Sequence, residues 1–404
     1  MRRALLGDVV ASMKNGIYKP ASEYSDEGVP CLRMYNIEAG AIAWRDVKRM
    51  RVTEEERDDY GLREGDLLVN RVNSRELVGK SAYIPASIEH SVFESKNIRV
   101  RLARDRAEPK FINYQLLARG SRHFANNAQQ VVGMASISQG QLANFPIVLT
   151  EIEEQRRVVA EIEKQFSRLD EAVANLQRVK ASVARYRAAV LSEAVGADQG
   201  EDHFVSVGSL LREPIVNGLS IKESATPTAV RALRLSAMTD TGFDYSDHRY
   251  LPIQPSKVDD IVVREGDFFV SRGNGSLSLV CRGTVAQTPP FPVIFPDTMM
   301  RLRFTDQAVM KWVAMLWPSR WIRAQIESRV KTTAGIYKIA QPQVASITLP
   351  LPPPDRRAEV LSEVDGRLSI VRGVEAQVEA NLKRAQALRQ AILAKAFGGA
   401  GADR

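Results

Sequence analysis

Cysteine is nearly absent from this chain, which has 2 cysteines, Cys31 and Cys281, in 404 residues. So low a count excludes a disulfide framework and is typical of a reducing compartment, so we expect two buried free thiols. No apolar run reaches the roughly 20 residues that a membrane-spanning helix needs. The basic N-terminus meets Asp8 at once, so it does not resemble a signal peptide. We therefore expect a soluble, cytoplasmic protein with no membrane contact.

The motifs of enzymes that act on DNA are also missing. A phosphate-binding loop ending at residues 79–81 would need a glycine where Ser74 stands. The prolines at 352–354 lack the leading acid or amide and the aromatic of an amino-methyltransferase motif. The 4 histidines show no metal-ligand spacing, and we expect Asp66 and Asp267 to organise turns rather than to bind Mg²⁺. We therefore expect no catalysis by this chain alone and no cofactor bound to it.

Negative charge is in modest deficit. Lys and Arg total 56 against 48 Asp and Glu, which gives a formal net charge of +8. An excess of this sign favours a polyanionic partner such as nucleic acid. A basic surface that binds no nucleic acid is an equally good interpretation of the charge by itself.

What the sequence does contain is a long internal repeat. Three segments of the first half return in the second: 61–71 as 262–272, 137–141 as 339–343, and 190–194 as 392–396. The offset is 201 residues for the first pair and 202 for the other two. A period this long excludes a solenoid of short repeats and indicates that one module was duplicated.

Within each half, a strand-rich region precedes a long helix. The predicted strands are 29–37, 65–71, 96–102 and 298–304, and the predicted shorter helices are 111–124 and 308–322. From 152 to 194 there is no Pro or Gly, and apolar residues alternate at spacings of three and four; the second half repeats this register from 361 to 392. The pattern is a heptad repeat, and each helix of about 42 residues would be roughly 60 Å long.

The two predicted long helices carry narrow apolar stripes of equal length, which favours pairing of the helices with each other. We predict that the helices pair as an antiparallel coiled coil about an internal pseudo-two-fold axis. The alternative is two independent amphipathic helices, each packed on its own domain. Charged residues interrupt the stripes, and we expect them to set the register by pairing with opposite charges, with one of them buried: Lys180, Arg187, Glu375 and Arg389. The predicted fold class is α+β, with two duplicated mixed α/β domains separated by the two long helices.

Polar and basic residues gather in loops at matching places in the two halves. Arg binds guanine and Asn binds adenine through two hydrogen bonds each, so such loops suit a DNA-reading surface. The alternative is that these loops are solvated and have drifted in sequence. The candidate DNA-binding residues are Lys19, Arg71, Asn73, Arg75, Arg122, Gln129 and Gln130 in the first half, and Lys222, Arg272, Asn274, Ser276, Lys331, Thr332, Tyr337 and Lys338 in the second.

In its order of variable domain, long helix, variable domain and long helix, the chain resembles the specificity subunit of type I restriction–modification systems. The likeness covers essentially all 404 residues. It rests on the repeated Arg-Glu-Gly-Asp strand, on the paired segments 137–141 and 339–343, and on helix starts with an acid followed by an Arg pair. The resemblance implies target-recognition domains at 1–150 and 199–352, and spacer helices at 151–198 and 353–404.

The resemblance also implies a division of labour. Each domain would read one half of a bipartite, asymmetric double-stranded DNA site, and the paired helices would set the gap and dock the partners. The partners would be two modification (methyltransferase) subunits, which bind S-adenosylmethionine and flip out a target adenine, and restriction (motor-nuclease) subunits. One departure is the stiff proline run at 352–354 where the first half has 150–152, which puts strict equivalence of the two domain–helix junctions in doubt.

Overall fold

The structure is a computed structural model that describes residues 2–131, 134–196, 204–333 and 335–398. Contacts within the chain group it into two compact units. Unit 1 comprises Met1–Leu176 and Ala380–Arg404, and unit 2 comprises Gln177–Glu379. Each long helix therefore contributes to both units. The domain boundaries at 150, 198 and 352 stay a prediction.

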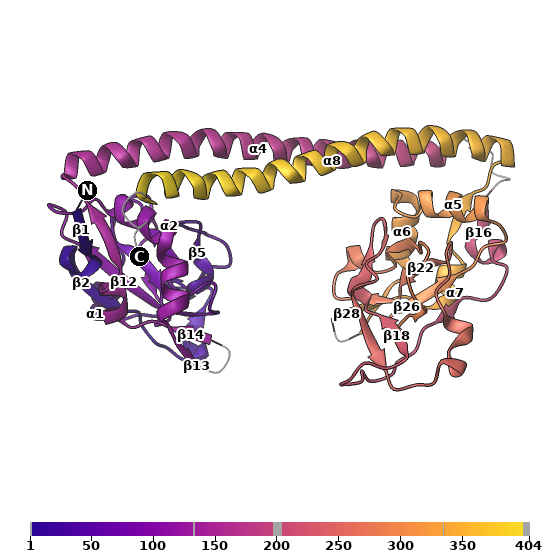
Figure 1. The fold of residues 1–404 in the computed structure, drawn as a ribbon, viewed down its shortest axis with the longest axis horizontal. Coiled ribbons are helices and arrows are strands. Elements are labelled where there is room, and N and C mark those ends of the chain that lie inside the picture. Colours follow the sequence, from indigo (N-terminus) through magenta and orange to yellow (C-terminus); the bar gives the residue numbers. More distant parts are fainter. Residues whose placement is uncertain (1, 132–133, 197–203, 334, 399–404) are drawn as a thin grey trace. The chain divides into compact units, whose positions relative to one another are not determined.

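Unit 1 is built on a four-stranded antiparallel sheet (Figure 1). Its order is β10 (Ser81–Tyr83), β8 (Leu67–Asn70), β12 (Asn97–Leu102) and β2 (Val10–Asn15). Smaller sheets surround it: β1 (Arg2–Leu5) with β15 (Pro146–Leu149); β11 (Val92–Phe93), β4 (Val29–Leu32), β7 (Lys48–Met50) and β3 (Tyr24–Ser25); β5 (Ile37–Glu38) with β6 (Ala41–Ile42); and β13 (Gln129–Val131), β14 (Met134–Ser136) and β9 (Val72–Asn73).

The helices of unit 1 begin where the sequence supplies the right cap. α1 (Glu54–Tyr60) starts at Thr53, whose hydroxyl accepts a hydrogen bond from the Glu56 N–H while the Glu56 carboxylate accepts one from the Thr53 N–H. α2 (Pro109–Asn127) starts with a proline at its first position, where the missing N–H costs nothing. The remaining elements are α3 (Gln139–Ala143), α4 (Ile152–Gly196) and the 3₁₀ turns η1 (Leu6–Val9), η2 (Ala21–Glu23) and η3 (Met34–Asn36).

Unit 2 repeats this plan. Its main sheet has the order β17 (Val216–Asn217), β26 (Met299–Leu302), β22 (Phe268–Ser271) and β24 (Gly283–Val285). Around it lie β16 (Phe204–Ser206) with β29 (Thr348–Pro350); β21 (His248–Leu251), β18 (Val230–Leu233) and β25 (Val293–Ile294); β19 (Met238–Thr239) with β20 (Gly242–Phe243); and β23 (Gly273–Asn274), β28 (Ile336–Lys338) and β27 (Lys331–Thr333).

The helices of unit 2 correct one prediction. The single helix predicted at 308–322 is two helices, α5 (Gln307–Leu316) and α6 (Arg320–Arg329). Pro318 cannot donate an intrahelical hydrogen bond, and the Ser319 hydroxyl caps the new helix by accepting from the Ile322 N–H. The remaining elements are α7 (Gln341–Ala345), α8 (Pro354–Phe397), η5 (Val207–Leu210), η6 (Leu235–Ala237), η7 (Pro255–Lys257), η8 (Asp259–Ile261) and η9 (Leu277–Leu279).

A second correction concerns the strand predicted at 29–37. Only Val29–Leu32 is a strand there, because η3 turns the chain before β5 begins at Ile37. The prediction of buried free thiols is confirmed, since Cys31 and Cys281 are both buried and unpaired. Burial raises the pKa of each thiol to about 12, so both remain protonated at neutral pH.

The two long helices pair in each unit. In unit 1 the first half of α4 packs with the last part of α8, and Val159, Phe166 and Phe397 join one buried cluster. In unit 2 the end of α4 packs with the start of α8, and Val190 and Val364 join another. These pairings make the helices antiparallel, as predicted, and exclude two independently packed helices.

The charged residues within the stripes find partners on the other helix. Arg389 bonds Asp170 at 2.7 Å in unit 1, and its guanidinium lies 4.3 Å from the centre of the Phe166 ring. In unit 2, Lys180 pairs with Glu379 at 3.3 Å and Arg187 with Glu375 at 3.4 Å. The pairing of opposite charges is confirmed, but the expected buried charge is not found, since the Lys180 and Glu379 side chains are 56% and 53% exposed.

Candidate nucleic-acid interface

The repeated Glu-Gly-Asp turn forms the same structure in both units. The Asp66 carboxylate accepts a hydrogen bond from the Arg63 N–H at 2.9 Å, and Asp267 accepts one from the Arg264 N–H at 2.9 Å. The glycine directly before each aspartate, Gly65 in unit 1 and Gly266 in unit 2, has φ of 83° and 80°, a conformation that favours glycine. Both acids organise a turn, as predicted.

An arginine in or directly after the neighbouring strand, Arg101 in β12 and Arg303 after β26, holds each turn in place. Arg101 donates to Asp66 at 2.9 Å, and Arg303 donates to Asp267 at 2.9 Å. The pair in unit 2 is deeper, because the Arg303 side chain is 8% exposed and that of Arg101 25%. Bonding to Asp267 raises the pKa of Arg303 above its usual value, so its charge is permanent.

In each unit the turn is followed by a strand, β8 or β22, and the arginine after that strand leads into a small polar sheet. The Arg71 N–H donates to the Lys96 carbonyl at 2.8 Å and its carbonyl accepts from the Ile137 N–H at 2.9 Å. Arg272 repeats both bonds with Thr298 and Ile339, at 2.7 and 3.0 Å. In each half, candidate residues that lie far apart in the sequence, such as Asn73 and Gln129, are therefore brought together in one three-stranded sheet. We call β9, β14 and β13 polar sheet 1, and β23, β28 and β27 polar sheet 2.

The two polar sheets have the same register. Asn73 faces Ala135, which faces Gln130, and in sheet 2 Asn274 faces Tyr337, which faces Thr332. The neighbouring row is Val72, Ser136 and Gln129 in sheet 1, and Gly273, Lys338 and Lys331 in sheet 2. Because alternate residues of a strand point to opposite faces, these rows lie on opposite faces of each sheet.

Burial decides which face is outward. Asn73 and Ala135 are 8% and 1% exposed, and Tyr337 packs against the core of unit 2, so these three side chains point inward, whereas Thr332, in the outermost strand of sheet 2, is exposed. Gln129, Lys331 and Lys338 are exposed and belong to the outward row. The hairpin tips add an outward apolar residue in each sheet, Met134 and Ile336, 37% and 44% exposed. The Gln130 side chain lies outside the described residues.

An amide network supports polar sheet 1 from beneath. The Asn73 amide donates to Asn70 at 2.8 Å, and the Asn70 amide donates to Asn97 at 3.2 Å and to the Lys96 carbonyl at 3.0 Å. The Asn73 side-chain oxygen accepts from the Ser74 N–H at 2.9 Å. These bonds favour a positioning role for Asn73 over base contact. Of the three asparagines in this network, only Asn73 is among the residues predicted from the sequence, because the strand that carries Asn97 is distant along the chain.

Unit 2 lacks this network, because Ser271 and Met299 stand where unit 1 has Asn70 and Asn97. The Ser271 hydroxyl instead donates to the Leu279 carbonyl at 2.9 Å. The Asn274 side-chain oxygen accepts from the Ser276 N–H at 3.0 Å, so Ser276 and Asn274 form a local turn.

The other predicted residues fall into two groups. Arg75 and Arg122 are exposed, and Arg75 donates to the Ala125 carbonyl at the end of α2 at 2.9 Å. Lys222 is also exposed. Lys19 is held by Glu56 at 2.7 Å and is only 16% exposed, which weakens its case as a DNA contact.

No catalytic or metal site emerges among the residues the structure describes. No group of three or more His, Cys, Asp or Glu residues in the described ranges could hold a metal ion. His123 stacks edge-on against Phe124 and Phe145, and burial lowers its pKa, which favours a structural imidazole. Within the same ranges, no helix is long and apolar enough to cross a membrane.

Three features characterise this protein. It has two duplicated α+β units, two long helices that pair in an antiparallel arrangement, and two polar sheets that share one frame but differ in their side chains. No family model matches the chain. It is 27% identical over 395 residues to the type I restriction enzyme EcoKI specificity subunit of Escherichia coli (strain K12), across 93% of this chain and 82% of that protein. It is 24% identical, with the same coverage, to the StySPI specificity subunit of Salmonella potsdam.

The fold has a solved counterpart. A chain from a structural study of complex assembly and conformational transition of the type I R-M system superposes with a TM-score of 0.69 at 18% identity, over 98% of this chain and 97% of that one. The resemblance noted in the sequence is confirmed: over nearly its whole length, this chain is a homologue of type I restriction enzyme specificity subunits.

Proposed function

We propose that this chain is the non-catalytic, sequence-specific DNA-binding subunit of a type I restriction–modification complex. The observation that carries the proposal is the pair of polar sheets, which share a frame and a register but differ in every outward residue of the matched row. A protein that reads one half of an asymmetric site with each unit needs this combination of a constant support and a variable surface.

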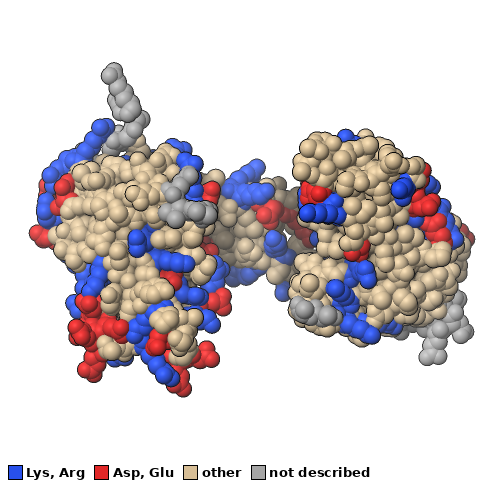
Figure 2. Space-filling model, turned by 90° about the horizontal axis from the view of Figure 1, so that it is seen from below, with Lys and Arg blue, Asp and Glu red and all other residues tan. Residues whose placement is uncertain are grey.

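The outward rows offer the chemistry of base and phosphate contact. Gln129 and Ser136 in unit 1 can each donate and accept hydrogen bonds with base edges. Lys331 and Lys338 in unit 2 can bind guanine acceptors or phosphates. The exposed Met134 and Ile336 suit the methyl group of thymine. Figure 2 shows Lys and Arg side chains in separate patches on the visible face of each unit, which suits several local contacts.

The paired helices supply a ruler in this proposal. Ion pairs between the helices, among them Arg367 with Glu193 at 2.7 Å, favour one register over others. A fixed register would set the number of base pairs between the half-sites. We further propose that the helices dock two modification subunits, which bind S-adenosylmethionine, and that restriction subunits join this assembly. Both curated relatives named above are specificity subunits, which supports this assignment.

The direct test is methylome sequencing of cells that carry this chain together with its modification subunits. We expect methylated adenines in a bipartite site with a spacer of constant length. Deletion of the gene for this chain should remove this methylation while the modification subunits remain. Methylation that persists without the chain, or that marks one uninterrupted sequence, would contradict the proposal.

A further inference from the structure

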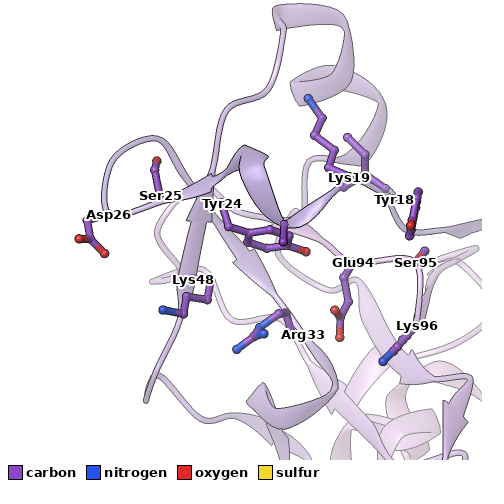
Figure 3. Close-up of a pocket in the computed structure, with 12 residues that line it drawn as sticks. Tyr18, Lys19, Tyr24, Ser25, Asp26, Arg33, Lys48, Glu94, Ser95 and Lys96 are labelled. Carbon is purple, nitrogen blue, oxygen red and sulfur yellow. The ribbon is translucent and has the colours of Figure 1, made fainter.

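Each unit has a groove beside its polar sheet, at an equivalent place in the repeat. Groove 1 has a volume of about 660 Å³ and groove 2 of about 590 Å³. The walls of groove 1 come from the loop after β2, from the turn at η3 and from β7 (Figure 3). Groove 2 is lined by the corresponding loop after β17, by the turn at η6 and by β21.

The floors of the two grooves are built by the same backbone pattern. Ile17 forms a parallel bridge with Glu94, and Leu219 forms one with Pro296. The Ser95 N–H donates to the Ile17 carbonyl at 2.9 Å, and the next residue after Pro296 repeats this bond to Leu219 at 3.2 Å. The grooves are therefore part of the duplicated frame and not chance hollows.

The floor of each groove also holds the start of the polar sheet. The last floor residues are Lys96 and Thr298. Their backbone carbonyls accept hydrogen bonds from the backbone N–H groups of Arg71 and Arg272. The Arg71 guanidinium reaches the Ser95 carbonyl at 3.4 Å. A ligand long enough to touch the outward face of a polar sheet can thus continue into the adjacent groove.

Groove 1 contains more cations than its acids neutralise. Arg33, Lys48 and Lys96 line it, and none forms an ion pair with a carboxylate of the described residues. Two acids also line groove 1, Asp26 and Glu94, and the Glu94 carboxylate is partly satisfied because it accepts the Met34 N–H at 2.8 Å. Figure 3 shows Arg33 and Glu94 on one side of the Tyr24 ring, with Lys96 beyond Glu94 and Lys19 turned away.

Groove 2 has the same character with different residues. Lys222 and Arg249 line it and form no ion pair with a described carboxylate. Arg234 is also present, but Glu223 binds it at 2.6 Å. Asp297, in the floor, is the one acid among the lining residues that the structure describes. The excess of positive charge is therefore kept in both repeats although the individual side chains differ.

We propose that each groove binds the sugar–phosphate backbone of the DNA next to the half-site that the adjacent polar sheet reads. The inference rests on the proposed function and adds a second contact surface to each unit. The cations of groove 1 stand on three separate elements and are spread along an open groove, which suits a polyanion with spaced charges better than one small anion. Phosphate contacts of this kind fix the register of a protein on DNA without reading sequence.

The test compares charge-neutral variants of the full chain. Lys48→Gln with Lys96→Gln alters groove 1, and Lys222→Gln with Arg249→Gln alters groove 2. The matched control, Lys164→Gln with Arg168→Gln, removes two exposed cations from α4. Binding to a duplex with the site found by methylome sequencing, and to a scrambled duplex, is measured from low to high salt. Ethylation interference then identifies the phosphates that each chain needs.

We expect each groove variant to reduce the slope of log K against log salt by about 1.8, or about 0.9 for each phosphate that the variant no longer neutralises. The weakening should be equal on both duplexes, and ethylation at phosphates flanking one half-site should cease to interfere, with the other half-site affected by the other variant. An unchanged slope and ethylation pattern, or a weakening confined to particular base pairs, would overturn the groove proposal alone. A wild-type chain that does not prefer its site would overturn the proposed function as well.

Discussion

Polar sheet 1 and polar sheet 2 occupy the same place on the same frame, yet they are held in different ways. Sheet 1 stands on a buried amide network of Asn73, Asn70 and Asn97 and presents neutral groups outward. Sheet 2 has no such network in the described residues and presents Lys331 directly opposite Lys338. Like charges at facing positions oppose strand pairing, so sheet 2 accepts a cost in stability that an anionic ligand would offset.

The contrast teaches where a duplicated module keeps its sequence and where it changes. The Asp-centred turn, the arginine that locks it and the two backbone bonds of Arg71 and Arg272 recur almost unchanged. The outward rows share no residue. Stability is thus concentrated in the frame, and the surface that we propose reads DNA is free to differ.

The largest expected effect is on the frame. Asp267→Asn removes the buried carboxylate partner of the Arg303 guanidinium and leaves it only the more exposed Glu213 carboxylate at 3.2 Å, so we expect a loss of about 3 kcal/mol in the free energy of unfolding of unit 2. Asp66→Asn should cost clearly less, because Arg101 is 25% exposed and can be hydrated. Denaturant unfolding followed by tryptophan fluorescence measures both variants, because Trp312, Trp317 and Trp321 report on unit 2 and Trp44 reports on unit 1. Equal losses of unfolding free energy in the two variants would contradict the proposed difference between the two Asp–Arg pairs.

The next effect is on the support of the sheets. Asn73→Ala removes two hydrogen bonds and leaves the Asn70 oxygen without its donor, so we expect a loss of about 1–3 kcal/mol. Asn274→Ala removes one bond in a local turn and should cost about 0.5–1.5 kcal/mol. Calorimetric unfolding of both variants measures the difference. Binding assays should show unchanged base preference for Asn73→Ala, and altered preference with normal stability would assign Asn73 to base contact.

The outward rows predict opposite signs for stability and binding. Lys331→Gln with Lys338→Gln relieves the facing charges and should stabilise unit 2 by about 0.2–1 kcal/mol. The same variant should bind DNA more weakly, with a salt slope reduced by up to about 1.8 if both lysines contact phosphate. The reciprocal change, Gln129→Lys with Ser136→Lys, should destabilise unit 1 and strengthen DNA binding. Stability and affinity that fall together would count against this account of sheet 2.

The smallest effect is expected on the helices. Glu379→Gln removes the partner of Lys180, and because both side chains are more than half exposed, we expect a loss of less than about 1 kcal/mol. Asp170→Asn should cost somewhat more, since Arg389 also packs over Phe166. Thermal unfolding at low and high salt measures both. A large loss of stability for Glu379→Gln would indicate that Lys180 is buried, contrary to the structure.

Periodicity explains which parts of the fold could be predicted. The long helices followed from a heptad pattern, and the apolar residues of the heptad stripes are buried or half-buried in the structure. The 202-residue offset paired the two halves correctly because the frame kept its residues. The helix 308–322 was wrong because a single proline, Pro318, outweighed a helical pattern on both sides of it.

The candidate site was less legible for a physical reason. β9 and β14 are two and three residues long, too short for any periodicity, and they pair across a long stretch of sequence. The sequence therefore indicated polar loops but not the sheet that joins them. It also could not separate outward Lys338 from inward Tyr337, because that distinction depends on register. Ser136 escaped notice for the same reason, although the repeat aligns it with Lys338.

The most direct test of the central claim, that each unit reads its own half-site through its polar sheet, is a methylome of cells carrying a transplanted sheet. Residues 71–75 and 129–138 are replaced by 272–276 and 331–340, and the rest of the chain is kept. We predict that one half of the methylated site changes while the other half and the spacer length stay the same. A change in both halves or in the spacer, or an unchanged site in a folded and active complex, would contradict the account.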